Sequence, residues 1–82
     1  MKHVINLYTK PSCPKCKILK AECEKSERIK NSDFQISEIT SENDTDYQLL
    51  FEHNIHMLPV LLVDNTFYNF DSAMMFVRGE LD

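Results

Sequence analysis

The sequence lacks any long uninterrupted apolar segment. Polar side chains recur every few residues from Met1 onward, so no stretch reaches the length of a signal-peptide core or of a membrane span. Cysteine is also scarce, and three is an odd number, which excludes a complete disulfide framework within one chain. We therefore expect a cytoplasmic protein whose cysteines perform chemistry or lie buried instead of cross-linking the fold.

Glycine is almost absent, and Gly79 is the only one in the chain. Internal repeats, low-complexity tracts and a second linker are missing as well, so 82 residues make a single domain, 1–82. The apolar share of 43% is high enough for a folded globule.

Charge is unevenly distributed along the chain. Residues 1–30 contain eight of the nine basic residues, whereas residues 31–82 contain ten of the thirteen acidic ones. A nucleic-acid-binding domain is expected to be basic overall, and this chain has a net charge of −4. The basic segment around the cysteines therefore indicates local tuning or docking to a partner protein.

Hydrophobic periodicity and turn signals predict seven elements. They are a strand at 4–8, a helix at 16–28, a strand at 34–39, a helix at 44–54, strands at 59–63 and 66–68 joined by Asp64-Asn65, and a helix capped by Asp71 or Ser72 that ends near Gly79. This order, β-α-β-α-β-β-α, predicts an α/β domain with a mixed four-stranded sheet and helices on both faces.

The segment Cys13-Pro14-Lys15-Cys16 carries the strongest chemical signal. Two cysteines three positions apart, at a strand-to-helix junction, lie about one helical turn from each other and can form a disulfide. The helix N-terminus and the nearby lysines stabilise a thiolate on Cys13, while Cys16, one turn further in, is expected to keep an ordinary pKa. Cys13 is then the attacking thiol and Cys16 the resolving thiol.

Two other interpretations of this cysteine pair remain open. A zinc site needs further ligands, and only Cys23 and three histidines at irregular spacing are available, so we predict no metal ligand set. A structural disulfide does not suit a reducing compartment.

The chain resembles the glutaredoxin-like members of the thioredoxin superfamily, including the small redoxins that serve ribonucleotide reductase. The matching segments are Tyr8 to Cys16, then Met57-Leu58-Pro59 before the apolar strand, then the Asp64-Asn65 hairpin. The resemblance implies a thioredoxin fold and a cis peptide bond before Pro59, with Leu58 offering its backbone to the substrate. It also implies that Lys10 meets a glutathione carboxylate, and that Tyr8, Pro14 and Asp71 border the substrate.

The chain departs from these relatives after its last strand. Glutaredoxins carry a Gly-Gly pair there, whereas this chain has Tyr68-Asn69-Phe70-Asp71. Glycine permits backbone angles and a close approach that other residues disfavour. We therefore expect weak glutathione recognition, with Asp71 mainly capping the helix.

Three other side chains have simpler interpretations. Cys23 lies seven residues after Cys16 on the same helical face, about 10 Å along the axis, and is expected to be a buried apolar thiol. His56 is expected to be solvated. Tyr8 either lines a substrate groove or packs on a helix.

The predicted function is that of a thiol-disulfide oxidoreductase, a monomeric electron carrier with no tightly bound cofactor. Its expected partners are a protein disulfide, ribonucleotide reductase among the candidates, and either glutathione as co-substrate or a flavin-dependent thioredoxin reductase as the electron source. The alternative is a thioredoxin-like binding module that holds a metal, or an iron–sulfur cluster shared through Cys13.

Overall fold

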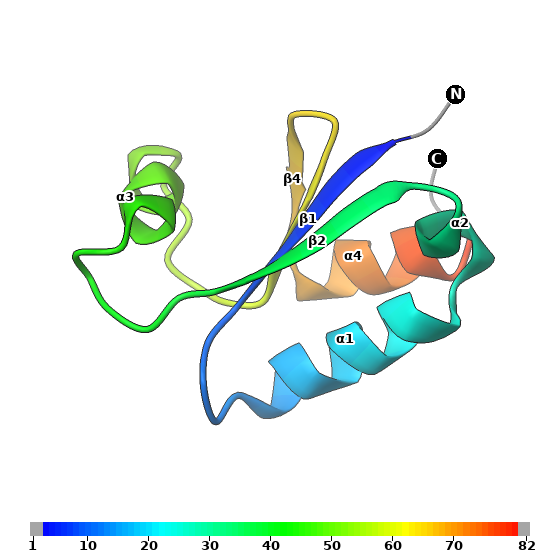
Figure 1. The fold of residues 1–82 in the computed structure, drawn as a ribbon, viewed down its shortest axis with the longest axis horizontal. Coiled ribbons are helices and arrows are strands. Elements are labelled where there is room, and N and C mark those ends of the chain that lie inside the picture. Colours follow the sequence, from blue (N-terminus) through cyan, green and yellow to red (C-terminus); the bar gives the residue numbers. More distant parts are fainter. Residues whose placement is uncertain (1–2, 81–82) are drawn as a thin grey trace.

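A computed structural model describes residues 3–80, which form a four-stranded mixed sheet with helices (Figure 1). In chain order the elements are β1 (Val4–Thr9), α1 (Pro14–Lys25), α2 (Glu27–Lys30), β2 (Asp33–Glu38), α3 (Thr45–Glu52), β3 (Val60–Val63), β4 (Thr66–Tyr68) and α4 (Phe70–Val77). The prediction of an α/β domain with a mixed four-stranded sheet is confirmed, and the short helix α2 was not predicted.

The sheet has the strand order β2-β1-β3-β4. Strand β1 pairs in parallel with β2 and antiparallel with β3, and β3 pairs antiparallel with β4. The β3–β4 turn is made by Asp64 and Asn65, both with positive φ, a conformation that these two residue types tolerate. Both Asp64 carboxylate oxygens bond to the start of β1, one to the His3 ring and one to the Val4 N–H.

Apolar side chains form two clusters, because alternate residues of a strand point to opposite faces. Ile5 and Leu7 of β1 belong to the cluster that α1 and α4 cover. Tyr8 belongs to the other cluster, which includes Leu50 of α3. Figure 1 shows α1 and α4 together on one side of the strands and α3 apart from them. Within residues 3–80 no helix combines the length and the apolar character needed to cross a membrane.

The predicted single helix from Cys16 to Arg28 is wrong at both ends. Helix α1 begins at Pro14, where a missing N–H costs nothing, and ends before Ser26. The Ser26 hydroxyl accepts the Ile29 N–H at the start of α2 and donates to the Val77 carbonyl at 2.7 Å. A hydrogen bond from the Ser26 side chain to α4, which is far away in sequence, therefore marks the boundary between α1 and α2.

Three other boundaries differ from the sequence prediction. Strand β2 runs one residue earlier than predicted, so Ile39 follows it, buried in the second cluster. Helix α3 is shorter than the predicted 44–54 and is capped by Asp44. Helix α4 is capped by Asn69, whose side chain accepts the Ser72 N–H at 2.9 Å, and not by Asp71 or Ser72.

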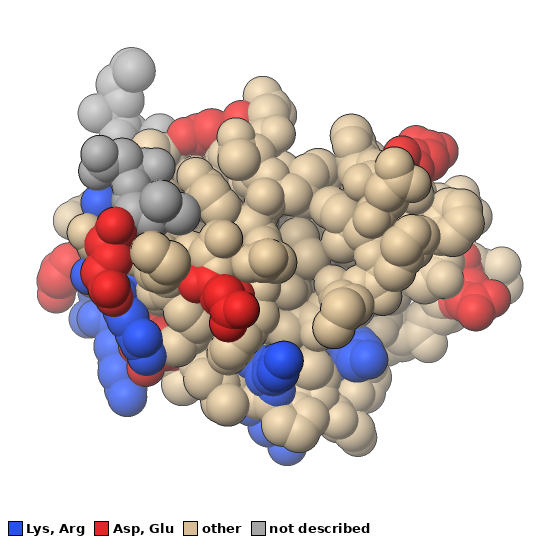
Figure 2. Space-filling view, turned by 180° about the vertical axis from the view of Figure 1, so that it is seen from behind, with Lys and Arg blue, Asp and Glu red and all other residues tan. Residues whose placement is uncertain are grey.

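The charge asymmetry of the sequence is visible on the surface. Figure 2 shows basic side chains along the lower edge of the molecule, where α1 lies, mixed with acidic ones toward α2. Acidic side chains lie at the right of this view, on the side of α3.

Candidate active site

Cys13 occupies the N-cap of α1, directly after the loop that leaves β1. Its sulfur accepts a hydrogen bond from the Cys16 backbone N–H at 3.2 Å. Hydrogen bonds to an ionised acceptor are stronger than neutral ones, so this N–H and the helix N-terminus favour a negative charge on the Cys13 sulfur. Both cysteines are thiols in this structure and are nearly covered, with Cys13 6% and Cys16 3% exposed.

Cys16 does not keep the ordinary pKa expected from the sequence. Burial, the hydrogen bond with Cys13 and the charge of Cys13 raise the pKa of Cys16 from 9.0 to about 11, against a lowering influence of Lys10. The correction follows from the position of Cys16, which is one turn inside α1 and covered by the fold. At neutral pH this thiol is protonated.

The loop before β3 supplies the opposite wall of the site. The Leu58–Pro59 peptide bond is cis, as the resemblance implied, and Pro59 is buried. The Leu58 carbonyl oxygen lies 4.0 Å from the Cys13 sulfur. This contact joins residues 45 positions apart, so the site combines a local cysteine pair with a distant backbone segment.

A groove of about 310 Å³ runs beside the two cysteines, between the start of α1 and the end of β2. Both thiols line it, together with Thr9, Lys10, Pro11, Ser12, Lys17, Lys20, Ile36 and Glu38. We call it the lysine groove. The sequence prediction named Lys10 as a substrate contact and counted Lys17 among the lysines that add positive potential at Cys13. Lys20 was not named, although it stands within four residues of Cys16.

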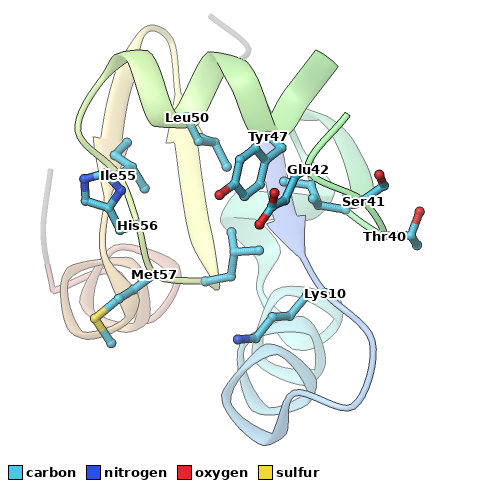
Figure 3. Close-up of a pocket in the computed structure, with 11 residues that line it drawn as sticks. Lys10, Thr40, Ser41, Glu42, Tyr47, Leu50, Ile55, His56 and Met57 are labelled. Atoms are coloured by element: carbon cyan, nitrogen blue, oxygen red, sulfur yellow. The ribbon is translucent and has the colours of Figure 1, made fainter. Parts of the chain in front are cut away.

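A second cavity of about 300 Å³ shares Lys10 with the lysine groove and is also lined by Leu58. Figure 3 shows the side chains of Tyr47 and Glu42 among those that line it, with Lys10 below them and Met57 at the edge. No spacing signal marks Glu42 or Tyr47, because their place in this cavity depends on how residues 39–44 fold over the end of the sheet.

The remaining predicted site residues divide into two groups. Pro14 is exposed beside Cys13, and Lys10 lines both cavities, so these two border the thiols. Tyr8 is 4% exposed in the core, which favours packing over contact with a substrate. Asp71 lies exposed in the first turn of α4, so the prediction that it caps this helix is wrong.

Cys23 and His56 behave as their sequence context predicted. Cys23 is completely buried, and burial raises the pKa of its thiol to about 12. His56 is exposed, with its ring against the edge of Phe51. Residues 3–80 contain no group of three or more His, Cys, Asp or Glu side chains that could hold a metal ion.

Comparisons with known proteins give information about the fold but not about the chemistry. No protein-family model matches the chain, and no curated protein matches it in sequence. A solved structure described as that of a malarial protein is similar over 100% of both chains, with a TM-score of 0.55 and 11% sequence identity. At this identity the similarity shows a shared α/β fold alone.

Proposed function

We propose that this chain is a thiol-disulfide oxidoreductase of the glutaredoxin-like type, built on a thioredoxin-like fold and acting through Cys13 and Cys16. The contacts of Cys13 carry the proposal. Its sulfur accepts the Cys16 N–H at 3.2 Å and lies 4.0 Å from the Leu58 carbonyl oxygen. A nucleophilic sulfur is therefore flanked by a second thiol on its own helix and by a backbone segment that can align a substrate.

In the first step the Cys13 thiolate attacks one sulfur of a substrate disulfide. A bond forms between the Cys13 sulfur and that atom, the substrate S–S bond breaks, and the other substrate sulfur leaves as a thiolate. The helix N-terminus and the Cys16 N–H stabilise the attacking thiolate beforehand. The product of this step is a mixed disulfide on Cys13.

In the second step Cys16 loses its proton and attacks the Cys13 sulfur. The Cys13–Cys16 disulfide forms and the remaining substrate sulfur leaves as a thiolate, so the substrate gains two electrons and the dithiol loses two. The charge and hydrogen bond of Cys13 help to hold the pKa of Cys16 at about 11. Both influences end when the Cys13 sulfur is bonded to the substrate. The pKa of Cys16 should therefore be lower in the mixed disulfide, where this thiol has to ionise.

The oxidised dithiol must then be reduced by an external donor, for which we propose flavin-dependent thioredoxin reductase in preference to glutathione. The start of α4 supports this choice. The Ser72 N–H already bonds to Asn69, and the Lys15 ammonium lies 5.4 Å from the centre of the Phe70 ring. One backbone donor at this helix start is therefore already satisfied, and Phe70 carries a ring where glutaredoxins have a glycine. We propose a protein disulfide as the substrate, ribonucleotide reductase among the candidates, and a cytoplasmic monomer as the acting form.

Reduction of insulin by the purified, reduced protein tests the function. We expect each parent molecule to reduce one insulin disulfide in a single turnover, no activity in Cys13→Ser, and in Cys16→Ser a stable mixed disulfide with no release of product. A Cys23→Ala variant is the matched control and should keep the parent rate. Activity in Cys13→Ser at the parent rate, or a brown, iron-containing dimer from purification without oxidant, would contradict the proposal.

The electron source is tested by two coupled NADPH assays on the same preparation. One assay contains glutathione and glutathione reductase, and the other contains thioredoxin reductase. We expect faster NADPH consumption with thioredoxin reductase. An equal or faster rate with glutathione would show that Asn69 and Phe70 do not impair glutathione binding.

A further inference from the structure

The lysine groove is lined by three lysines as well as by the two reactive cysteines. Lys10 comes from the loop after β1, and Lys17 and Lys20 come from the first half of α1. Glu38, at the end of β2, is the one carboxylate among the lining residues. The groove is therefore positive in a protein whose net charge is −4.

These three charges have no ion-pair partner in the described part of the chain. The ion pairs that α1 and α2 form there lie further along, between Glu22 and Arg78 and between Glu27 and Lys30. All three lysines of the groove are exposed. Their positive potential is consequently available to a molecule that approaches the cysteines.

The groove has the dimensions of a short extended peptide. Cys13 and Lys20 are seven residues apart on or next to α1, which corresponds to about 10 Å along the helix axis. An extended chain covers that distance in about three residues. Ile36, 42% exposed on β2, gives the groove an apolar wall that a peptide side chain can cover.

We propose that the lysine groove binds an acidic segment of the substrate protein, with Asp or Glu within about three residues of the disulfide cysteine. This rests on the proposed oxidoreductase function and adds the substrate class to it. Lys17 and Lys20 are specificity residues that attract the segment, while Cys13 and Cys16 perform the two-electron exchange described above. Long-range attraction of this kind raises association rates by roughly 10–1000-fold at low ionic strength.

The test uses three synthetic peptides with the same intramolecular disulfide, flanked by Asp and Glu, by Ser and Asn, or by Lys and Arg. The prereduced protein is mixed with each peptide, and formation of the Cys13–Cys16 disulfide is followed in a single turnover at low and high salt. We expect about a tenfold higher second-order rate constant for the acidic than for the basic peptide at low salt. The difference should nearly vanish at about 1 M salt, where screening acts within about 3 Å.

Two double variants separate the groove from overall charge. Lys17→Gln with Lys20→Gln removes two charges inside the groove, and Lys25→Gln with Lys30→Gln removes two charges from helix ends outside it. We expect the first pair to lose most of the preference for the acidic peptide and the second pair to retain it. Circular dichroism checks folding, and the salt dependence of the parent tests the proposal even if a variant does not fold.

Equal rate constants for the three peptides in the parent would overturn the proposal while leaving the oxidoreductase function intact. No reduction of any peptide would instead contradict the proposed function itself. Glutathione disulfide is tested as a fourth substrate in the same assay. If the groove variant slows its reduction as much as that of the acidic peptide, the groove serves any small anion, and the assignment to an acidic polypeptide is wrong.

Discussion

Replacing Cys13 by Ser should lower the pKa of Cys16 and make this thiol more reactive. Two of the influences that raise the pKa of Cys16 to about 11 come from Cys13, through its hydrogen bond and its charge. Serine is the suitable replacement because its hydroxyl can still cap α1 by accepting the Cys16 N–H. The structural change is then limited to the loss of the Cys13 sulfur.

The size of the effect has an upper limit. At pH 8 a thiol with a pKa of about 11 is ionised in about one molecule in a thousand. Burial, the largest cause of the shift, remains in the variant, so the pKa of Cys16 should fall between 9.0 and about 11. Complete return to 9.0 would raise the thiolate fraction roughly a hundredfold, and the lower nucleophilicity of a less basic thiolate reduces the gain to about tenfold.

The assay is alkylation by iodoacetamide at pH 8, followed by tryptic mapping. Cleavage after Lys15 and Lys20 places the three cysteines on separate peptides, so each alkylation rate is measured on its own. In the parent we expect Cys13 to react first, and in Cys13→Ser we expect Cys16 to react several-fold faster than it does in the parent. In both proteins the rate at Cys16 should increase with pH up to its pKa.

An unchanged or slower rate at Cys16 in Cys13→Ser would refute this reasoning, because it would mean that Cys13 does not influence the pKa of Cys16. Faster labelling of Cys16 than of Cys13 in the parent would contradict the assignment of Cys13 as the attacking thiol. Cys23→Ala serves as the control, since removal of a distant buried thiol should leave the Cys16 rate unchanged.

Three further predictions follow from burial, capping and packing. Because the folded pKa of Cys23 is about 12 against an ordinary 9.0, the unfolded chain loses this proton first, and the free energy of unfolding should fall by about 2 kcal/mol between pH 8 and 10.5. Cys23→Ala should remove that part of the decrease in urea titrations at the two pH values. Asn69→Ala should cost about 1 kcal/mol of stability through loss of the α4 cap, whereas Asn69→Asp should cost much less; equal losses in thermal melts would exclude capping as the cause. Phe70→Gly should increase glutathione-dependent turnover relative to that with thioredoxin reductase, and an unchanged ratio in the coupled assays would mean that Phe70 does not limit glutathione binding.

The local half of the candidate site was predictable because its chemistry depends on short spacing. A strand that ends near Thr9, two cysteines three apart and a proline between them together define an N-cap and a first helical turn. The raised pKa of Cys16 was missed because it arises from burial by the folded chain. Spacing within α1 contains no information about that burial.

The distant half of the site depends on tertiary structure. Leu58 was identified only through the resemblance to glutaredoxins, since nothing in residues 54–60 indicates a partner 45 positions away. Glu42 and Tyr47 were not identified at all. They reach the second cavity because Ile39 is buried after β2 and directs the following loop over the end of the sheet.

Helix ends were misplaced where one side-chain hydrogen bond decides between neighbouring capping residues. Asn69, Asp71 and Ser72 are all plausible caps by residue type. The backbone leaves β4 in an extended conformation that ends at Asn69, so this residue becomes the cap. At Ser26 the deciding partner is Val77 of α4, which periodicity within α1 cannot reveal.

Because Cys23 is completely buried, the lifetime of the oxidised protein depends on how often its core opens. Once Cys13 and Cys16 are joined, Cys23 is the one thiol that remains, and solvent reaches it only when the apolar cluster under α1 opens. An opening that also unfolds α1, which otherwise holds Cys23 about 10 Å from Cys16, allows Cys23 to attack the Cys13–Cys16 disulfide and rearrange it. Alkylation of Cys23 in the oxidised protein therefore measures the opening of this cluster: its rate at high reagent concentration, where labelling is faster than reclosing, and its equilibrium population at low concentration.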